Sequence, residues 1–399
     1  MIDATFFQNN RHTLLRSLGN GALVVVTGYR EVQQAHDMAA PFVQEGNFWY
    51  LTGIDAPNWW LIIEGNGKAF AVAPDVDDVK QTFDGSLDHA EAKRTSGVDR
   101  IISRDEALRI IRQAKRNHSM VYTVDQPKYI REHAGFHLNP AQHELRQTLE
   151  RIYPSVKDCS QELATLRTIK QPGEIKMISK AVKITVDAFQ ELKKELQQYR
   201  FEYEAEAKLT YDIRRSGATG HAYAPIVAGG VRACTLHYVI NDAPLRKKSL
   251  LLFDVGAKYG GYAADISRTY AIGTVSQRAG LVHDTVRAAQ AEIIACLKPG
   301  LRFTEYQKHV DRIMSQALLR LSLDPELLHT YMPHAIGHGL GIDVHDALAG
   351  FDTLQPGMVL TVEPGVYLPD EEIGVRIEDD ILITETGHTN LSRGLDSSY

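Results

Sequence analysis

The sequence has 399 residues and a formal net charge of −6, with 44% hydrophobic and 24% charged residues. This composition is typical of a globular protein, and the length predicts two or three domains rather than a single core. A nucleic-acid-binding protein would need clustered Lys and Arg on a basic domain, so the acidic balance argues against that class.

The cysteines and the apolar stretches bear on the compartment. Cys159, Cys234 and Cys296 lie far apart and form no CxxC pair, so neither a disulfide framework nor a Cys-rich zinc site is expected. The N-terminal residues lack the continuous apolar stretch of a secretory signal. No window reaches the ~20 apolar residues that a membrane span needs. We therefore expect a cytoplasmic protein that does not bind membranes.

Residues 1–155 are predicted to form an N-terminal α/β domain. Short apolar or β-branched runs predict strands at residues 22–27, 48–52, 59–63 and 69–73. The spacing of charged and apolar residues predicts helices at 106–114 and 143–152. Strands that alternate with helices are typical of an α/β domain.

A domain boundary is expected between residues 153 and 173, which gives a second domain over 156–399. Pro172 and Gly173 are a start signal for a helix from Glu174, where apolar residues recur at helical spacing. Further helices are predicted at residues 203–215, 282–296 and 304–321, and strand-like runs fill much of the remainder.

Two aspartates in the second domain follow or precede apolar strands. Asp254 ends the run 250–254, and Asp265 lies eleven residues later in another strand-like run. The turn at 258–261 would join the two strands in a hairpin with both carboxylates on one face. A surface hairpin with two solvated aspartates is the alternative, while a buried pair would need a cation.

Three histidines and two glutamates complete the set of candidate residues. His334, His338 and His345 lie within twelve residues in a Gly-rich segment. An HxxxH pair can bind zinc from one face of a helix, but the glycines argue against a helix here, so we do not assign all three to a metal. Glu363 ends an apolar strand, and Glu378 lies in a strand-like run in which it faces the same way as Arg376. Four carboxylates and one histidine suit Mn²⁺, with Co²⁺ or Zn²⁺ also allowed, and suffice for two cations.

These segments resemble the signatures of the pita-bread metallopeptidases, in particular the proline-specific branch of Xaa-Pro dipeptidase (prolidase) and aminopeptidase P. The matching pieces stand in the family's order: Asp254-Val-Gly, Asp265-Ile-Ser-Arg-Thr, His338-Gly-Leu-Gly, Glu363-Pro-Gly and Val375-Arg-Ile-Glu378-Asp. The resemblance implies an α+β fold, with a C-terminal pita-bread (creatinase/aminopeptidase-like) catalytic domain after a smaller α/β creatinase-like N-terminal domain. Residues 48–53 resemble that N-terminal domain.

The resemblance also implies roles for individual residues. The implied metal ligands are Asp254, Asp265, His338, Glu363 and Glu378. Of these, Asp265 and Glu378 would bridge two ions. The implied catalytic residues are Glu363, His345, His237, His334 and Arg376. The implied substrate contacts are His237, His334, His345, Tyr223 and Tyr367.

The implied activity is metal-dependent hydrolysis of the Xaa-Pro peptide bond by a hydroxide that bridges two divalent ions. The compact segment between Glu363 and Glu378 resembles short prolidases, which favours a dipeptidase, with an aminopeptidase acting on longer peptides as the alternative. More distant alternatives are a metal-free, creatinase-like hydrolase and a non-catalytic binding protein. The implied partners are a proline-containing di- or oligopeptide and a second copy of the chain in a homodimer.

Overall fold

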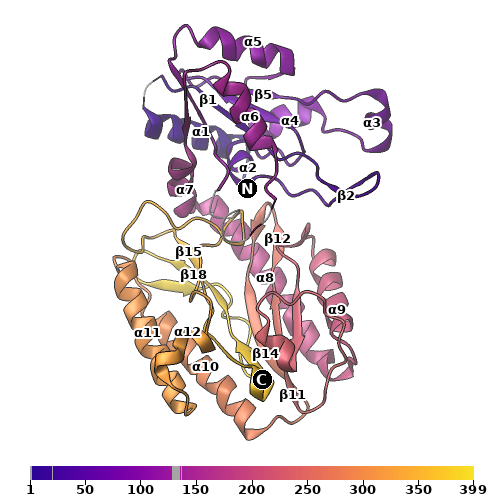
Figure 1. Ribbon diagram of the computed structural model, residues 1–399, viewed down its shortest axis with the longest axis vertical. Coiled ribbons are helices and arrows are strands. Elements are labelled where there is room, and N and C mark those ends of the chain that lie inside the picture. Colours follow the sequence, from indigo (N-terminus) through magenta and orange to yellow (C-terminus); the bar gives the residue numbers. More distant parts are fainter. Residues whose placement is uncertain (1, 20, 128–134, 136) are drawn as a thin grey trace. The chain divides into compact units, whose positions relative to one another are not determined.

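The computed structural model describes residues 2–19, 21–127, 135 and 137–399 (Figure 1). It divides into two units, Met1–Leu166 and Arg167–Tyr399. The boundary predicted after residue 155 lies before this division. The first unit extends further because β8 (Ser155–Asp158) still pairs with β7 (Met120–Thr123) in its sheet. Among the helices of the described ranges, none has the length and apolar character needed to cross a membrane.

A mixed sheet forms the centre of the first unit. In the described part of the chain its strand order is β6-β5-β4-β1-β7-β8, with β1 antiparallel to β4 and parallel to β7. The remaining strands of this sheet are β1 (Val24–Thr27), β4 (Trp60–Ile63), β5 (Ala69–Val72) and β6 (Arg100–Ile102). Their side chains include the buried Val25, Ile62 and Phe70. The strands predicted at 22–27, 59–63 and 69–73 are therefore confirmed.

Helices and one small hairpin complete the first unit. The hairpin consists of β2 (Gln33–Ala35) and β3 (Met38–Ala39). The helices are α1 (Ala4–Leu18), α2 (Gly46–Thr52), α3 (Asp78–Phe83), α4 (His89–Ser96), α5 (Arg104–Ala114) and α6 (Ala141–Glu150), and α7 (Ser160–Thr168) leads into the second unit. The predicted helices at 106–114 and 143–152 correspond to α5 and α6.

The strand predicted at residues 48–52 is wrong, because this segment is helix α2. The Glu45 carboxylate caps the helix by accepting the backbone N–H of Phe48 at 2.6 Å, and Gly53 ends it with a φ of 67°. Phe48, Tyr50 and Leu51 are all buried. A short run that is buried on every side is apolar throughout, so its pattern does not distinguish a helix from a strand.

Helices cover the strands of the second unit on two sides (Figure 1). Helix α8 packs against the strands β12 and β13, and α10 packs against β15, β16 and β17. The helices are α8 (Pro172–Glu195), α9 (Glu202–Arg215), α10 (Gln277–Ala295), α11 (Phe303–Arg320) and α12 (Leu328–Tyr331). At the start of α8, the Glu174 carboxylate accepts the backbone N–H of Gln171 at 2.9 Å. The four helices predicted in this domain are confirmed.

The strands of the second unit form several small sheets. In the described residues the orders are β10-β11-β14, β13-β12-β9, β15-β18-β19 and β16-β17. The bounds are β9 (Gly220–His221), β10 (Ile226–Gly229), β11 (Ser249–Val255), β12 (Ala257–Tyr259), β13 (Tyr262–Ala263), β14 (Ile266–Ile272), β15 (Val359–Val362), β16 (Gly365–Leu368), β17 (Ile373–Arg376), β18 (Asp379–Ile383) and β19 (His388–Asn390). β11 pairs antiparallel with β14. The strands that follow β11 and precede β14, β12 and β13, also pair antiparallel and are joined by a turn, which confirms the predicted hairpin.

An apolar core holds the helices α10 and α11 onto the strands β15–β18. It includes Val286, Met314, Leu360, Val375 and Ile381, each at most 3% exposed. Burial of such side chains contributes about 1.5–3 kcal/mol each. This core fixes the strand ends, which is where the candidate site residues lie.

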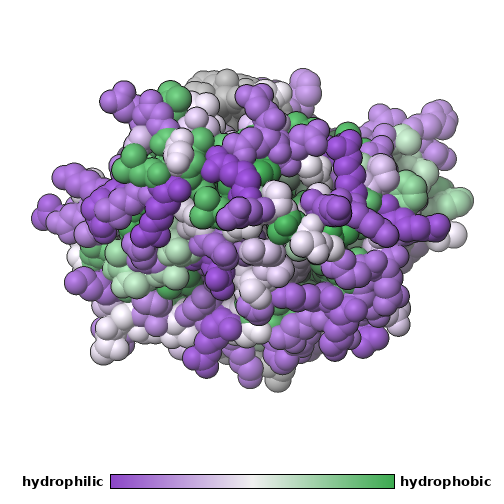
Figure 2. All heavy atoms as spheres, turned by 90° about the horizontal axis from the view of Figure 1, so that it is seen from below, coloured by the Kyte–Doolittle hydropathy of each residue, from purple (hydrophilic) through white to green (hydrophobic). Residues whose placement is uncertain are grey.

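On the face of the molecule shown in Figure 2, hydrophilic side chains predominate and hydrophobic ones are scattered among them.

Candidate metal centre

Asp254 and Asp265 lie at one end of the β11–β14 pair. Asp254 is the penultimate residue of β11 and pairs with Ser267, while Asp265 directly precedes β14. The Tyr223 hydroxyl lies 2.5 Å from Asp254 Oδ1 and 2.5 Å from Asp265 Oδ1. Both carboxylates therefore face the same side, as the sequence predicts. A phenol has one proton to donate, so it serves only one of the two carboxylates at a time.

His338 comes from an irregular segment that runs beside β15. Its backbone carbonyl accepts the N–H of Thr361 at 2.9 Å, and its own N–H donates to Thr361 Oγ1 at 3.1 Å. A Cβ at Gly337 would lie 2.1 Å from the Thr361 carbonyl oxygen, so this close approach requires glycine. His338 Nδ1 lies 3.0 Å from the carbonyl oxygen of Gly339, which leaves Nε2 to face the carboxylates.

The two glutamates also lie at strand ends. Glu363 directly follows β15, and its N–H donates to the Ile336 carbonyl at 2.9 Å. Glu378 lies between β17 and β18. Its N–H donates to the Ser267 carbonyl at 3.0 Å, and its Oε2 accepts the Ser267 hydroxyl at 2.8 Å. Ser267 thus ties Glu378 to the strand that follows Asp265.

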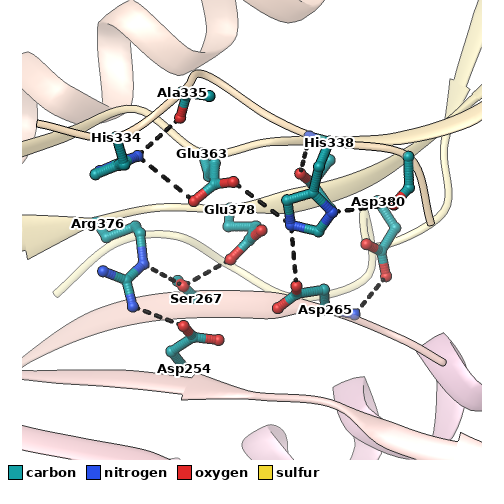
Figure 3. A network of polar contacts seen from close by, with 12 residues as sticks. Asp254, Asp265, Ser267, His334, Ala335, His338, Glu363, Arg376, Glu378 and Asp380 are labelled. Carbon is teal, nitrogen blue, oxygen red and sulfur yellow. Dashed lines mark hydrogen bonds and ion pairs between the residues drawn. The ribbon is translucent and has the colours of Figure 1, made fainter. Parts of the chain in front are cut away.

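The five predicted metal ligands line one small cavity of about 70 Å³. Its lining residues are Leu236, His237, Asp254, Asp265, His334, His338, His345, Glu363, Arg376 and Glu378. Figure 3 shows His338 between Glu363 and Asp265, with His338 Nε2 3.4 Å from Asp265 Oδ2 and 3.5 Å from Glu363 Oε1.

The donor set fits a divalent cation. One ligand atom each from Asp265, His338 and Glu378 lies within 4.8 Å of the others. Glu378 Oε1 is buried and has no hydrogen-bond partner among the described residues. Buried carboxylate oxygens that face one another without donors need a cation or a proton. Carboxylate oxygens and an imidazole nitrogen are ligands that Mn²⁺, Co²⁺ and Zn²⁺ accept.

Arg376 links three parts of the site. Its Nη2 lies 2.6 Å from Asp254 Oδ2, its Nε donates to the Ser267 hydroxyl at 2.9 Å, and its Nη1 donates to the Tyr367 hydroxyl at 2.9 Å. The residue is only 4% exposed. One buried guanidinium thus orients Asp254 directly and Glu378 through Ser267.

The three remaining histidines also line the cavity. His334 Nε2 lies 2.9 Å from the Tyr367 hydroxyl, and His334 Nδ1 lies 3.7 Å from Glu363 Oε2. The His345 ring packs edge-on against the His338 ring, with centroids 4.2 Å apart. His237 is exposed and reaches the cavity from the segment that follows β10. All the site residues predicted from the sequence except Tyr223 and Tyr367 thus line the cavity, and these two bond to lining residues.

Burial and crowding perturb the acid–base chemistry of the site. Burial raises the pKa of Asp265 and of Glu378 well above the usual range, and the neighbouring carboxylates add to the shift. Burial raises the pKa of Glu363 to about 7, although His338 and Arg376 oppose the shift. Burial lowers the pKa of His334 and of His345 to about 4, so both imidazoles are neutral near pH 7.

These shifts predict how the stability of the metal-free protein depends on pH. A carboxyl group whose pKa is raised on folding stabilises the fold at low pH, and this contribution is lost as pH rises through the folded pKa. A histidine of the unfolded chain binds a proton with an ordinary pKa of about 6.5, so the buried histidines add no slope only above about pH 7.5. Raising the pH from 7.5 to 9 should therefore lower the Tm of metal-free protein as the buried carboxyl groups with raised pKa ionise, by about 2–4 °C per 1 kcal/mol lost.

Saturation with Mn²⁺ should flatten that decline, because the metal replaces the protons. Calorimetry of chelated and loaded protein across this pH range would measure both slopes. A Glu378→Gln variant serves as the control, since it removes one of the raised carboxyl groups and should reduce the slope of the metal-free protein. A Tm of the metal-free protein that rises over this range would contradict the assignment.

The sequence reasoning missed several residues that hold the ligands. The Asp265 N–H donates to Asp380 Oδ2 at 3.1 Å, and Asp380 is fully buried. Arg268 Nη1 donates to the Glu378 carbonyl at 2.7 Å. Arg268 lies within the predicted motif 265–269, and Asp380 directly follows the motif that ends at residue 379, so these positions were the available signal. Asp346 follows His345 and lies 2.8 Å from Arg167 Nη2, a partner far away in sequence that no local pattern indicates.

Comparisons with known proteins match both units. Metallopeptidase family M24 matches residues 176–385, and the aminopeptidase P N-terminal domain matches residues 7–122. The Xaa-Pro aminopeptidase of Escherichia coli (strain K12) is 31% identical over 417 residues, which cover 97% of this chain and 94% of the relative. The solved structure of E. coli aminopeptidase P in its low-pH form has a TM-score of 0.86 at 28% identity and covers 100% of this chain and 96% of that one. Zn-substituted E. coli aminopeptidase P in complex with product matches with a TM-score of 0.86 at 29% identity, over 99% and 96% of the two chains.

Proposed function

Because this chain belongs to metallopeptidase family M24, we propose that it is an Xaa-Pro aminopeptidase, which removes the first residue from peptides whose second residue is proline. Membership confirms the predicted pita-bread fold with a smaller N-terminal domain and a metal-dependent peptidase acting on Xaa-Pro bonds. The sequence alone favours a dipeptidase. The comparisons favour the aminopeptidase alternative instead, since the similarity to Xaa-Pro aminopeptidase spans nearly the whole of both chains.

One observation carries the proposal: five ligand-type side chains and three further histidines line a single cavity in a domain of this family. In the proposal, two divalent ions would be held by Asp254, Asp265, His338, Glu363 and Glu378. When bound, two such ions lower the pKa of a coordinated water toward neutrality and polarise the scissile carbonyl. The oxygen-rich ligand set supports Mn²⁺ as the native metal.

The chain's own residues would orient the substrate and move protons. The neutral His345 can donate an N–H to the oxygen on which negative charge develops. His237 and His334 would hold the proline side of the peptide. Tyr367 fixes His334 through a hydrogen bond, and Arg376 fixes Tyr367. Because these side chains are already held in position, less entropy is lost when the substrate is oriented for reaction.

Proton delivery is a necessary part of the reaction. When the C–N bond breaks, the departing proline nitrogen, like any peptide nitrogen, must acquire a proton to leave as an amine. Glu363 lines the cavity, with its carboxylate 3.5 Å from His338 Nε2, which supports it as the group that gives this proton.

We also propose that the protein is a cytoplasmic homodimer. Three cysteines that form no disulfide support the reducing compartment, and gel filtration with light scattering would test the dimer.

A substrate panel tests the proposal. After chelation and reloading with Mn²⁺, we expect Xaa-Pro-Yaa tripeptides to be cleaved at least about tenfold faster than Xaa-Pro dipeptides, because an aminopeptidase site stays open beyond proline. Chelated protein should retain less than about 1% of the rate, since the water pKa shift is lost. Tripeptides with Ala in second place serve as the control and should be poor substrates. Faster cleavage of the dipeptide would restore the dipeptidase interpretation.

A further inference from the structure

The segment that carries His237 has little regular structure, yet a single buried side chain holds it at several points. We define the His237 segment as residues 229–243, from Gly229 at the end of β10 to Ala243. It contains one short 3-10 helix, η3 (Gly230–Cys234). Its residues Leu236 and His237 line the cavity of the metal centre.

Glu202, the first residue of α9, is the common partner of this segment. Its Oε1 accepts the Gly229 N–H at 3.0 Å and lies 3.4 Å from Arg232 Nε. Its Oε2 accepts the Tyr238 hydroxyl at 2.9 Å and the Ala243 N–H at 3.1 Å. Glu202 is fully buried. A buried carboxylate is costly unless donors surround it, and here four donors from one segment do so.

The fixed points lie on both sides of His237. Tyr238 is its immediate neighbour, and Arg232 comes five residues earlier. Two backbone turns connect these points, since the Thr235 N–H donates to the Arg232 carbonyl at 2.9 Å and the Tyr238 N–H donates to the Thr235 carbonyl at 3.2 Å. The backbone at His237 therefore cannot shift far without breaking a bond to Glu202 or one of these turns.

We propose that Glu202 is a positioning residue that sets where His237 stands at the cavity. This inference rests on the proposed function, in which His237 contacts the substrate. Glutamine has the same shape but cannot replace Glu202, because one end of its amide is a donor. With the amide nitrogen toward Gly229 and Arg232, both of these donors lose their acceptor. With it toward Tyr238 and Ala243, the Ala243 N–H loses its acceptor, while the Tyr238 hydroxyl can turn to Asp242 Oδ1, 3.4 Å away.

A double-mutant cycle tests whether Glu202 acts through His237. We expect Glu202→Gln to lower kcat/KM on an Xaa-Pro-Yaa peptide by about 10–100-fold at unchanged metal content. In a His237→Ala background the same change should cost less than about twofold, because the residue that Glu202 positions is gone. Glu204→Gln is the matched control. Glu204 lies in the same turn of α9 but accepts the N–H groups of Arg200 and Phe201, so its loss should change kcat/KM less than about twofold.

Hydrogen exchange supplies a readout that does not depend on activity. Amides of residues 229–243 should exchange at least about tenfold faster in Glu202→Gln, with Gly229 and Ala243 most affected, and Glu204→Gln should not change them. Should Glu202→Gln fail to fold, Tyr238→Phe removes a single bond to Glu202 beside His237. We then expect a loss of kcat/KM of about two- to fivefold that vanishes in the His237→Ala background.

Equal losses in the two backgrounds would overturn the proposal, and so would unchanged exchange in the His237 segment. Inactivity of the wild-type, metal-loaded protein on every Xaa-Pro-Yaa peptide would instead overturn the proposed function. In that case the exchange measurement would still decide whether Glu202 holds the segment.

Discussion

Glu363→Gln is expected to lower kcat on an Xaa-Pro-Yaa peptide by about 10²–10⁴-fold, the usual contribution of general acid–base catalysis. The substitution keeps the shape of the side chain and an oxygen that can face a metal ion. It removes the carboxylate at the cavity that would pass a proton to the departing nitrogen. Steady-state kinetics at saturating Mn²⁺ would measure the loss.

Two controls separate proton transfer from loss of the metal. Metal content of the variant should be measured at the Mn²⁺ concentration used for kinetics, and only fully loaded protein compared. Glu385→Gln, an exposed carboxylate in the same domain, should leave kcat unchanged. A fully loaded Glu363→Gln enzyme with kcat within about threefold of wild type would exclude Glu363 as the proton carrier.

Arg376→Met is expected to lower the free energy of unfolding of the metal-free protein by about 3–5 kcal/mol, because it leaves the Asp254 carboxylate, which is only 14% exposed, without its cation. The guanidinium lies 2.6 Å from Asp254 Oδ2 and also bonds to Ser267 and Tyr367. Activity should fall as well, since Asp254 and Tyr367 lose the group that orients them. Urea unfolding and kinetics on the same preparation would measure both effects.

An exposed arginine provides the comparison for Arg376. Arg246 lies 3.1 Å from Glu372, and both side chains are more than half exposed. Arg246→Met should therefore cost less than about 1 kcal/mol. Arg376→Lys keeps the charge but cannot make three directed contacts, so its stability should lie between that of the wild-type protein and that of Arg376→Met. Equal stability of Arg376→Met and wild type would contradict the central role given to this residue.

The ligand motifs could be predicted from the sequence because each is a local pattern. Each motif places a carboxylate next to an apolar strand, where burial of the charge costs free energy unless a cation or a partner is present. These carboxylates belong to Asp254, Glu363 and Glu378. The strand alternation that makes β11 and β14 also determines which face their side chains take. The hairpin near Asp265 was predictable because the turn at 258–261 separates two strand-like runs.

Other features depend on partners that are remote in sequence. Helix α2 was predicted as a strand because Phe48 and Leu51 are buried on all sides, which removes the helical periodicity of the pattern. Glu202 resembles any acidic residue in the first turn of a helix until the His237 segment packs against it. Its role arises from contacts between residues up to 41 positions apart, and local sequence propensity does not predict such contacts.

The ligands come from widely separated segments of the second unit, and this has a consequence for how the protein matures. Asp254 lies on β11, whereas Glu378 follows β17 and is tied to Ser267 by hydrogen bonds. The site is therefore incomplete until synthesis has passed residue 378 and β17 and β18 have packed in place. Assembly through such distant contacts comes late in folding. Metal uptake should thus be a post-synthetic event that selects fully folded chains, and a chain truncated before Glu378 would hold its ions weakly.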